Sequence, residues 1–335
     1  MRVKNCILGL LFSVSFGAGP AGASAFSSFY VFGDSLSDIG SSPSAVMSVY
    51  NLLLDNCDPS YPCPPYYEGR FSNGPVTAEY LANAVLPGGA NSANFHDYAV
   101  GGSTTGIGNV GDGGSATNIG LGFPGMEAQF AAYFTSSIGT TPNPNALFMV
   151  WGGGNDLTYG GSVTTAADNI AGYVDELAAS GAKNILVPNL PDLGLTPDAL
   201  AQGTAAAQAL NLASQQFNQL LATQLSNLSE KFPGVRIVDF DTYDFFDNLL
   251  KNAVNYGFTD ITDACVSASF QACSNPASYI FWDGEHPTTH VDSILGPALA
   301  DAMTAPLPPA AWLFAAGLYG LYLNGNIRRN NHKRA

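Results

Sequence analysis

Short apolar runs alternate with helical stretches along most of this 335-residue chain. The runs contain β-branched and aromatic residues and are bounded by glycine, proline or asparagine, which is typical of buried strands. We expect strands at 29–33, 94–100, 146–151, 184–188 and 235–240, and helices at 77–86, 124–137, 164–180 and 204–231. Such alternation predicts an α/β fold: a three-layer α/β/α sandwich around a five-stranded parallel sheet.

The first expected strand stops abruptly at Gly33-Asp34-Ser35. In the flavodoxin-like strand order 2-1-3-4-5, which we expect here, the topological switch lies between the first and third strands, where ligands bind. Ser35 would then face the loop that follows Trp151. A serine hydroxyl is a weak nucleophile without a neighbouring base, so from these residues alone a serine that caps a helix is the favoured interpretation of Ser35.

The loop after Trp151 reads Gly-Gly-Gly-Asn155-Asp156-Leu157. Three glycines allow the backbone to approach a ligand closely, and the Asn155 amide is a donor that stays neutral at every pH. Such a donor suits a developing oxyanion. An ordinary Asn-Asp turn after a strand is the alternative interpretation.

A third group of polar residues lies near the end of the chain. Asp283 and His286 are three residues apart in a loop that ends at Pro287, so a turn can bring both side chains to one side. A carboxylate bound to one imidazole nitrogen leaves the other nitrogen free to act as a base. We choose His286 as the base, because a structural or solvent role is expected for the other histidines, which are His96, His290 and His332.

These blocks resemble the GDSL or SGNH hydrolases. The matching residues, in the order of the family, are Gly-Asp-Ser-Leu at 33–36, Gly102 after the second strand, Gly-x-Asn-Asp at 153–156 and Asp-x-x-His at 283–286. Residues 70–75 and 189–194 resemble the larger lipase-like members, so the resemblance covers nearly the whole body of the chain.

The resemblance implies a role for each matching residue. Ser35 would be the nucleophile, His286 the base and Asp283 its orienting partner. The oxyanion hole would consist of the Ser35 amide, the Gly102 amide and the Asn155 side chain. The implied protein is a serine ester hydrolase acting on a lipid or other small-molecule ester, without a cofactor or metal.

Two other functions use the same sequence features. An acyltransferase would have the same site and differ only in the molecule that attacks the acyl-enzyme. A surface or matrix binding protein would keep the fold without turnover. Residues 106–111 formally match a dinucleotide fingerprint, but no strand directly precedes them and no helix directly follows. We interpret 106–125 as a mobile loop beside the site, and expect loops 55–75 and 101–125 to set the substrate.

Both ends of the chain are expected to be targeting segments. Residues 1–25 have the basic start, apolar stretch and small residues of a secretory signal peptide. Residues 305–335 resemble the PEP-CTERM class of sorting tails, in its Val-Pro-Leu-Pro-Ala variety, and an ordinary membrane anchor is the alternative. The body, 26–304, is then one exported domain at the cell envelope or outside the cell. The tail would insert in the membrane until a sorting protease cuts it, or anchor the protein permanently.

Four cysteines remain after the signal peptide. Their even number in an exported chain and their close spacing favour two local disulfides, Cys57–Cys63 and Cys265–Cys273. Metal binding is the weaker alternative, because neither pair has the Cys-x-x-Cys spacing of a zinc site.

The negative charge of the body argues against polyanionic partners. The two ends hold six of the eleven Lys and Arg residues and no Asp or Glu, so the body has five basic and 26 acidic residues. Nucleic acids and anionic lipid surfaces would be repelled, and neither is expected as a partner. The sequence does not determine the oligomeric state, and we expect a monomer.

Overall fold

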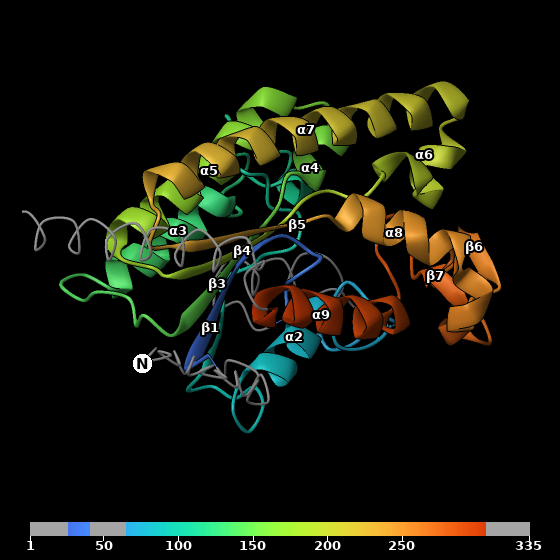
Figure 1. Ribbon diagram of the computed structural model, residues 1–335. Coiled ribbons are helices and arrows are strands. Elements are labelled where there is room, and N and C mark those ends of the chain that lie inside the picture. The colour runs from blue at the N-terminus through green and yellow to red at the C-terminus, as the bar shows by residue number, and fades with distance from the viewer. Residues whose placement is uncertain (1–25, 41–64, 306–335) are drawn as a thin grey trace, which may run out of the picture. The chain divides into compact units, whose positions relative to one another are not determined.

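The computed structural model describes residues 26–40 and 65–305 (Figure 1). Those up to Thr304 belong to one compact unit. Five parallel strands form its central sheet in the order β2-β1-β3-β4-β5, which confirms the predicted topology. They are β1 (Ser28–Gly33), β2 (Phe95–Asp97), β3 (Ala146–Trp151), β4 (Asn184–Pro188) and β5 (Arg236–Phe240).

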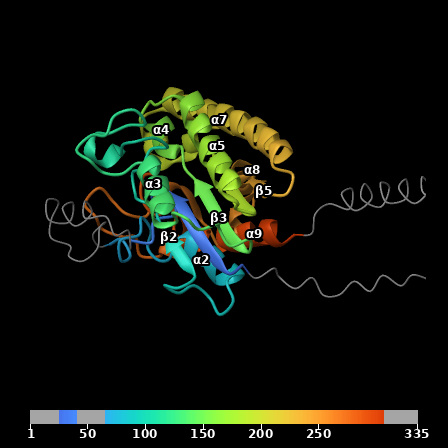
Figure 2. The same cartoon turned by 90° about the vertical axis from the view of Figure 1, so that its left-hand side faces the viewer.

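Helices cover both faces of the sheet because side chains of its central strands alternate between two apolar cores. On β1, Tyr30 and Phe32 pack into one core, whereas Phe29 and Val31 pack into the other. The first core is covered by α3 (Met126–Ser136), α5 (Val163–Ser180) and α7 (Thr204–Lys231), and the second by α2 (Thr77–Val85) and α9 (Thr289–Thr304). Figures 1 and 2 show these two helical layers on opposite sides of the strands.

Two predicted elements differ in the structure. The expected strand 94–100 has regular strand geometry only over Phe95–Asp97, where the Asp97 carboxylate accepts the Ala99 amide two residues on. The Tyr98 and Val100 amides nevertheless still donate to carbonyls of β1, at 2.9 and 3.3 Å. Asn155, expected in a loop, lies in the short helix α4 (Gly154–Thr158). This helix begins after Gly153, whose φ of 113° is open to glycine but strained for other residues.

Several elements were not predicted, and most of them lie in the last third of the chain. They include a second sheet of two strands, β6 (Asp260–Ala264) and β7 (Tyr279–Phe281). The others are helices α6 (Pro197–Ala201) and α8 (Thr242–Lys251) and 3-10 turns η1 (Val110–Asp112), η2 (Leu193–Leu195), η3 (Ala253–Tyr256) and η4 (Pro276–Ser278).

One predicted disulfide falls in this region. Cys265 and Cys273 are joined, and they pack with Val266 and Trp282 in a small apolar cluster. Cys57 and Cys63 lie outside the described residues, as do the predicted signal peptide and nearly all of the predicted sorting tail. Among the described residues, no helix combines the length and the apolar character needed to cross a membrane.

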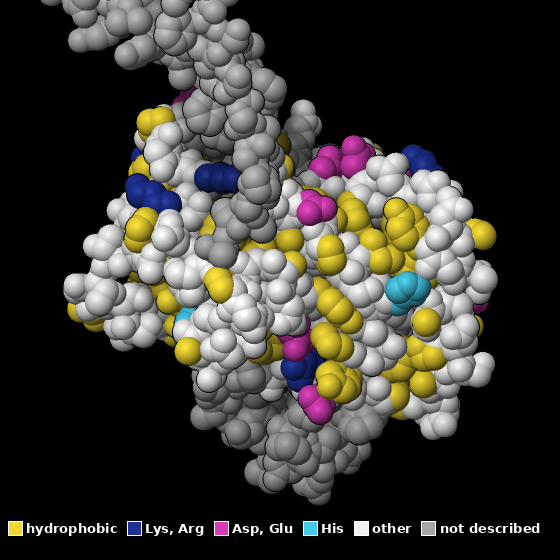
Figure 3. Space-filling model, turned by 60° about the horizontal axis from the view of Figure 1, so that its bottom comes forward, with side chains coloured by type: hydrophobic (Ala, Val, Ile, Leu, Met, Phe, Trp, Pro, Cys, Tyr) yellow, Lys and Arg dark blue, Asp and Glu magenta, His cyan; other side chains and the backbone are white. Residues whose placement is uncertain are grey.

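The surface fits the acidic composition. On the described part of the face in Figure 3, Lys and Arg side chains are few and do not merge into a patch. Several basic residues make ion pairs: Arg70 with Glu68 and Glu79, Lys231 with Asp175, and Lys251 with Asp247.

Candidate active site

Ser35 lies just beyond the C-terminal end of β1, in the middle of the sheet. The strand leads to this position through Gly33, where a Cβ atom would come within 2.3 Å of the Trp151 carbonyl oxygen. The Gln129 side chain from α3 forms two hydrogen bonds with the backbone of the same residue. Its Oε1 accepts the Gly33 amide at 2.9 Å and its Nε2 donates to the Gly33 carbonyl at 2.7 Å. The backbone before Ser35 is therefore held from several directions.

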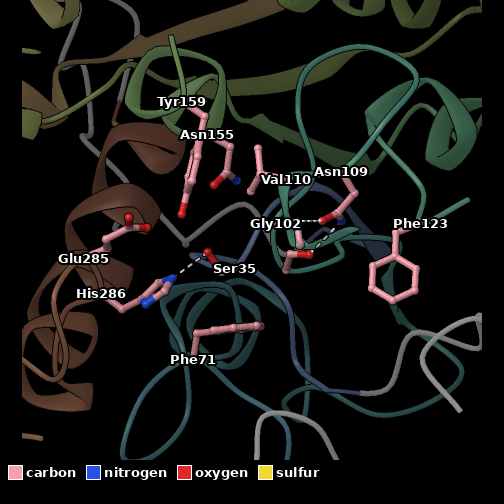
Figure 4. Close-up of a pocket in the computed structure, with 12 residues that line it drawn as sticks. Ser35, Phe71, Gly102, Asn109, Val110, Phe123, Asn155, Tyr159, Glu285 and His286 are labelled. Carbon is pink, nitrogen blue, oxygen red and sulfur yellow. Dashed lines mark hydrogen bonds between the residues drawn. The ribbon is translucent and has the colours of Figure 1, made fainter. Parts of the chain in front are cut away.

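The structure brings Ser35, His286 and Asp283 together. Ser35 Oγ lies 2.7 Å from His286 Nε2, although the two residues are 251 positions apart (Figure 4). On the other side of the ring, His286 Nδ1 lies 2.8 and 2.9 Å from the two Asp283 carboxylate oxygens. The turn between them is closed by the Glu285 and His286 amides, which both donate to Asp283 Oδ1. This arrangement can remove the proton from the serine hydroxyl.

Electrostatics favour an ionised Asp283 beside a basic imidazole. Burial alone would raise the pKa of Asp283, but the charge and hydrogen bond of His286, the Glu285 amide and the Tyr66 hydroxyl outweigh it and lower the pKa to about 2. Burial would lower the pKa of His286, but the charge and hydrogen bond of Asp283 raise it to about 9. The two groups thus stabilise each other's charged forms.

Two aromatic residues that sequence reasoning missed support this pair. Tyr66 donates a 2.7 Å hydrogen bond to Asp283 Oδ2 from 217 positions away, and its ring packs edge-on against Trp282. Phe71 lies against the His286 ring with centroids 5.0 Å apart. The resemblance pointed to residues 70–75 without assigning them a contact, and nothing in the spacing of Tyr66 indicates its partner.

The residues expected to bind an oxyanion lie around Ser35. Gly102 has a φ of 77°, which favours glycine, and Asn155 is 8% exposed. One Asn155 Nδ2 hydrogen is used by the Ser103 carbonyl at 2.9 Å, so the second remains available. Within 26–40 and 65–305, the Ser35 and Gly102 amides donate to no protein acceptor. The Ser35 and Gly102 amides and the Asn155 side chain thus keep hydrogen-bonding capacity beside the Ser35 hydroxyl.

Two buried carboxylates hold the loops that carry these donors. Asp38 accepts the Gly101 amide at 2.8 Å, next to Gly102. Asp156 accepts both the amide and the hydroxyl of Thr105, at 2.8 and 2.9 Å. Burial raises the pKa of Asp38 to about 6 and also raises that of Asp156. These contacts tie the tip of β1 and helix α4 to the loop after β2.

A cavity of about 150 Å³ opens over Ser35. Figure 4 shows Glu285 and His286 on one side of the serine, and Gly102, Asn109 and Phe123 on the other. The predicted loop 101–125 thus lies beside the site. It contains the 3-10 turn η1 and isolated β-bridges between its own residues. Of the other predicted loop, 55–75, only residues from 65 on are described.

Comparison with known proteins gives one family match. The sequence profile of the GDSL-like Lipase/Acylhydrolase family matches residues 29–299. A protein of Aeromonas hydrophila named Phosphatidylcholine-sterol acyltransferase is 32% identical over 251 residues, which are 73% of this chain and 67% of that protein. A GDSL esterase/lipase of Arabidopsis thaliana is 27% identical over 333 residues, covering 85% of this chain and 92% of the relative. A solved structure from the lipolytic G-D-S-L family of Veillonella parvula aligns with a TM-score of 0.39 at 12% identity, covering 84% of this chain and 99% of that one.

Proposed function

This chain belongs to the GDSL-like lipase/acylhydrolase family, and from that premise we propose that it is a serine ester hydrolase with Ser35 as its nucleophile. The observation that carries the proposal is the continuous hydrogen-bonded series from Ser35 Oγ through the His286 ring to Asp283, with distances of 2.7 and 2.8 Å. A helix-capping serine has no need of such a base.

The reaction follows from the geometry. His286 Nε2 takes the Ser35 proton as Oγ attacks the ester carbonyl carbon, and Asp283 stabilises the resulting imidazolium. The carbonyl oxygen becomes an oxyanion held by the Ser35 and Gly102 amides and the Asn155 side chain. The C–O bond to the alcohol then breaks, and His286 gives its proton to the leaving alcohol. Water repeats the cycle on the acyl-enzyme and releases the acid.

Acyl transfer is the second candidate, and the name of the Aeromonas relative favours it. An alcohol would replace water in the second half of the reaction, with the same residues. Product analysis with and without an added long-chain alcohol separates the two: a new ester that forms at the expense of free acid indicates transfer.

Export of the domain is also part of the proposal. A signal peptide over 1–25 and a sorting tail over 305–335 would leave 26–304 as the mature catalytic domain. Intact-mass measurement of the protein from its native host tests both ends. A mature species that still carries Arg334 would contradict cleavage of the tail and favour a permanent anchor.

The test of the function is replacement of Ser35 by alanine. Ser35→Ala should abolish hydrolysis of p-nitrophenyl esters, a loss of at least about 10⁴-fold in kcat, because no other group can form the acyl-enzyme. Ser37→Ala is the matched control. Its buried hydroxyl finds no hydrogen-bond partner among the described residues, so full activity is expected. Activity in a pure, folded Ser35→Ala preparation, or no turnover of any ester by the wild type, would contradict the proposal.

A further inference from the structure

A second cavity lies beside the site, between the end of the main sheet and helices α8 and α9. Resting on the proposed function, we propose that this cavity binds the acyl chain of the substrate, and that the chain is of medium length. Its wall is mostly carbon: Leu36, Trp151, Leu193, Phe246, Leu250 and Leu295 all line it.

The cavity adjoins a smaller hollow at the proposed nucleophile. This hollow is lined by Ser35, Asn155, Leu193 and Thr196, among others. Leu193, Thr196, Leu36 and Glu285 also line the apolar cavity. Because the two spaces share these walls, the proposal directs a chain attached to a carbonyl carbon at Ser35 through this hollow toward the apolar cavity.

In this arrangement, the alcohol part of the ester would lie on the opposite side of Ser35 from the apolar cavity. Glu285 lines both hollows and the main pocket, and in Figure 4 it lies on the far side of Ser35 from Asn109 and Phe123. The two parts of an ester extend in different directions from its carbonyl carbon. The acyl chain would run past Glu285, and the alcohol toward the loop of Asn109 and Phe123.

Most polar atoms in the wall are already bonded within the protein. Trp151 Nε1 donates to the Asn189 carbonyl at 3.2 Å, and Thr196 Oγ1 donates to the Leu193 carbonyl at 2.9 Å. Tyr243 Oη accepts from Asn211 at 2.8 Å and from a second amide on α7.

Three acidic groups line this cavity: Asp192 and Asp247 are bonded to other protein groups, and Glu285 lies where the cavity adjoins the hollow at Ser35. The Asp192 carboxylate accepts the Gly194 amide and the Asn211 amide, and Asp247 is paired with Lys251 at 2.7 Å. A polar ligand entering here would lose its water and find few new partners, whereas a hydrocarbon chain would lose nothing. The wall therefore selects an alkyl chain.

The volume of the cavity limits the size of that chain. It is about 60 Å³, against about 150 Å³ for the pocket over Ser35. Enlarging the cavity would require movement of the core, because the wall residues Leu295 and Trp151 are only 1% and 2% exposed. An acetyl group would leave the cavity unused.

A chain-length series is the first test. We expect kcat/KM for p-nitrophenyl esters to rise from acetate to a medium-chain ester by about fourfold for each methylene that enters, and then to level off or fall. Highest activity on the acetate would overturn the acyl-chain assignment while leaving the proposed function intact.

Variants of Leu250 test whether the chain-length preference arises in the apolar cavity. This residue lines the apolar cavity but not the hollow at Ser35, so it marks the far part of the chain's path. Leu250→Phe should shorten the preferred chain and lower kcat/KM for decanoate about tenfold while butyrate is unchanged. Leu250→Ala should move the preference toward longer chains. The exposed Leu212 of α7 provides matched controls, Leu212→Phe and Leu212→Ala, which should not change the series. If both Leu250 variants fold and show the same dependence of kcat/KM on chain length as the wild type, the proposal is overturned.

Binding can be measured without turnover. Trp151 lines the cavity, so a decanoic acid brominated at its terminal carbon should quench tryptophan fluorescence of Ser35→Ala in a saturable way. Adding Leu250→Phe should weaken this binding at least about fivefold, and adding Leu212→Phe should not. Absence of saturable quenching would count against the cavity, whereas residual ester hydrolysis by Ser35→Ala would count against the proposed function.

Discussion

The proposed nucleophile and base, Ser35 and His286, lie 2.7 Å apart, but different kinds of structure hold them. Ser35 follows a central strand of the main sheet, and the groups that fix its backbone, Gly33 and Gln129, are themselves buried in the core. His286 lies in a loop after the small sheet, where Tyr66, Phe71 and Trp282 surround it and its partner.

We expect substitutions around Ser35 and around His286 to differ in their effects, the first mainly on stability and the second mainly on catalysis. The surroundings of Ser35 belong to the cooperative core, so a change there should lower the stability of the whole domain. The surroundings of His286 are a local assembly of loops, so a change there should alter the imidazole more than the fold. The four predictions below test this contrast.

The largest expected effect is on the oxyanion donors. Asn155→Ala should lower kcat by about 10²- to 10³-fold with a smaller change in KM, because the second Nδ2 hydrogen bond forms fully only in the transition state. Steady-state kinetics on one ester measure both constants. A pure KM effect would make Asn155 a substrate-binding residue instead.

Gln129→Leu should act mainly on stability. It leaves the buried Gly33 amide without its partner and removes a bond to the Gly33 carbonyl, so the free energy of unfolding should fall by about 2–3 kcal/mol. Urea unfolding measures the change, with Gln216→Leu, at an exposed position of α7, as the control. An unchanged midpoint of urea unfolding would show that the stability of the core does not depend on the hydrogen bonds between Gln129 and Gly33.

The disulfide near the base should have a local effect. In the chain-entropy view, closing the short loop from Cys265 to Cys273 contributes about 2.5 kcal/mol. The two cysteines pack in the cluster of Trp282, and the Cys265 amide donates to the Phe281 carbonyl of β7. Cys265→Ser/Cys273→Ser should therefore increase hydrogen exchange in β6 and β7 and leave β1 protected. Equal loss of protection in β1 would argue against two separate regions.

The smallest expected effect is that of Tyr66→Phe. Because His286 must be neutral to act as base, kcat/KM should rise with pH through an apparent pKa above the ordinary 6.5, toward the value of about 9. Without the Tyr66 hydroxyl, Asp283 attracts the imidazole proton more strongly, so this pKa should rise further, by about 0.3–0.5 units. We also expect kcat to fall about threefold to tenfold.

A pH–rate profile of Tyr66→Phe beside Tyr67→Phe provides the matched comparison, since the neighbouring Tyr67 is 40% exposed. The free energy of unfolding should change little in either variant. A shift of the Tyr66→Phe profile to lower pH, or no shift, would contradict the positioning role.

The sequence by itself determined the sheet and its strand order. Apolar alternation and helical periodicity depend on neighbours within a few residues, so β1, β3, β4, α5 and α7 could be placed closely from the chain alone. The residues of the candidate site could be named because Gly33, Gly102 and Asn155 lie in blocks that resemble, in order, the motifs of the family.

Only the tertiary structure decided how distant residues combine. Nothing local signals that Tyr66 contacts Asp283, that the chain after β5 forms a second sheet, or that Leu36 and Leu250 line one cavity. Each of these depends on packing between segments far apart in the chain, where side-chain shape and volume select the partner. Sequence patterns carry the periodicity of an element, but the contacts between elements are settled by close packing in three dimensions.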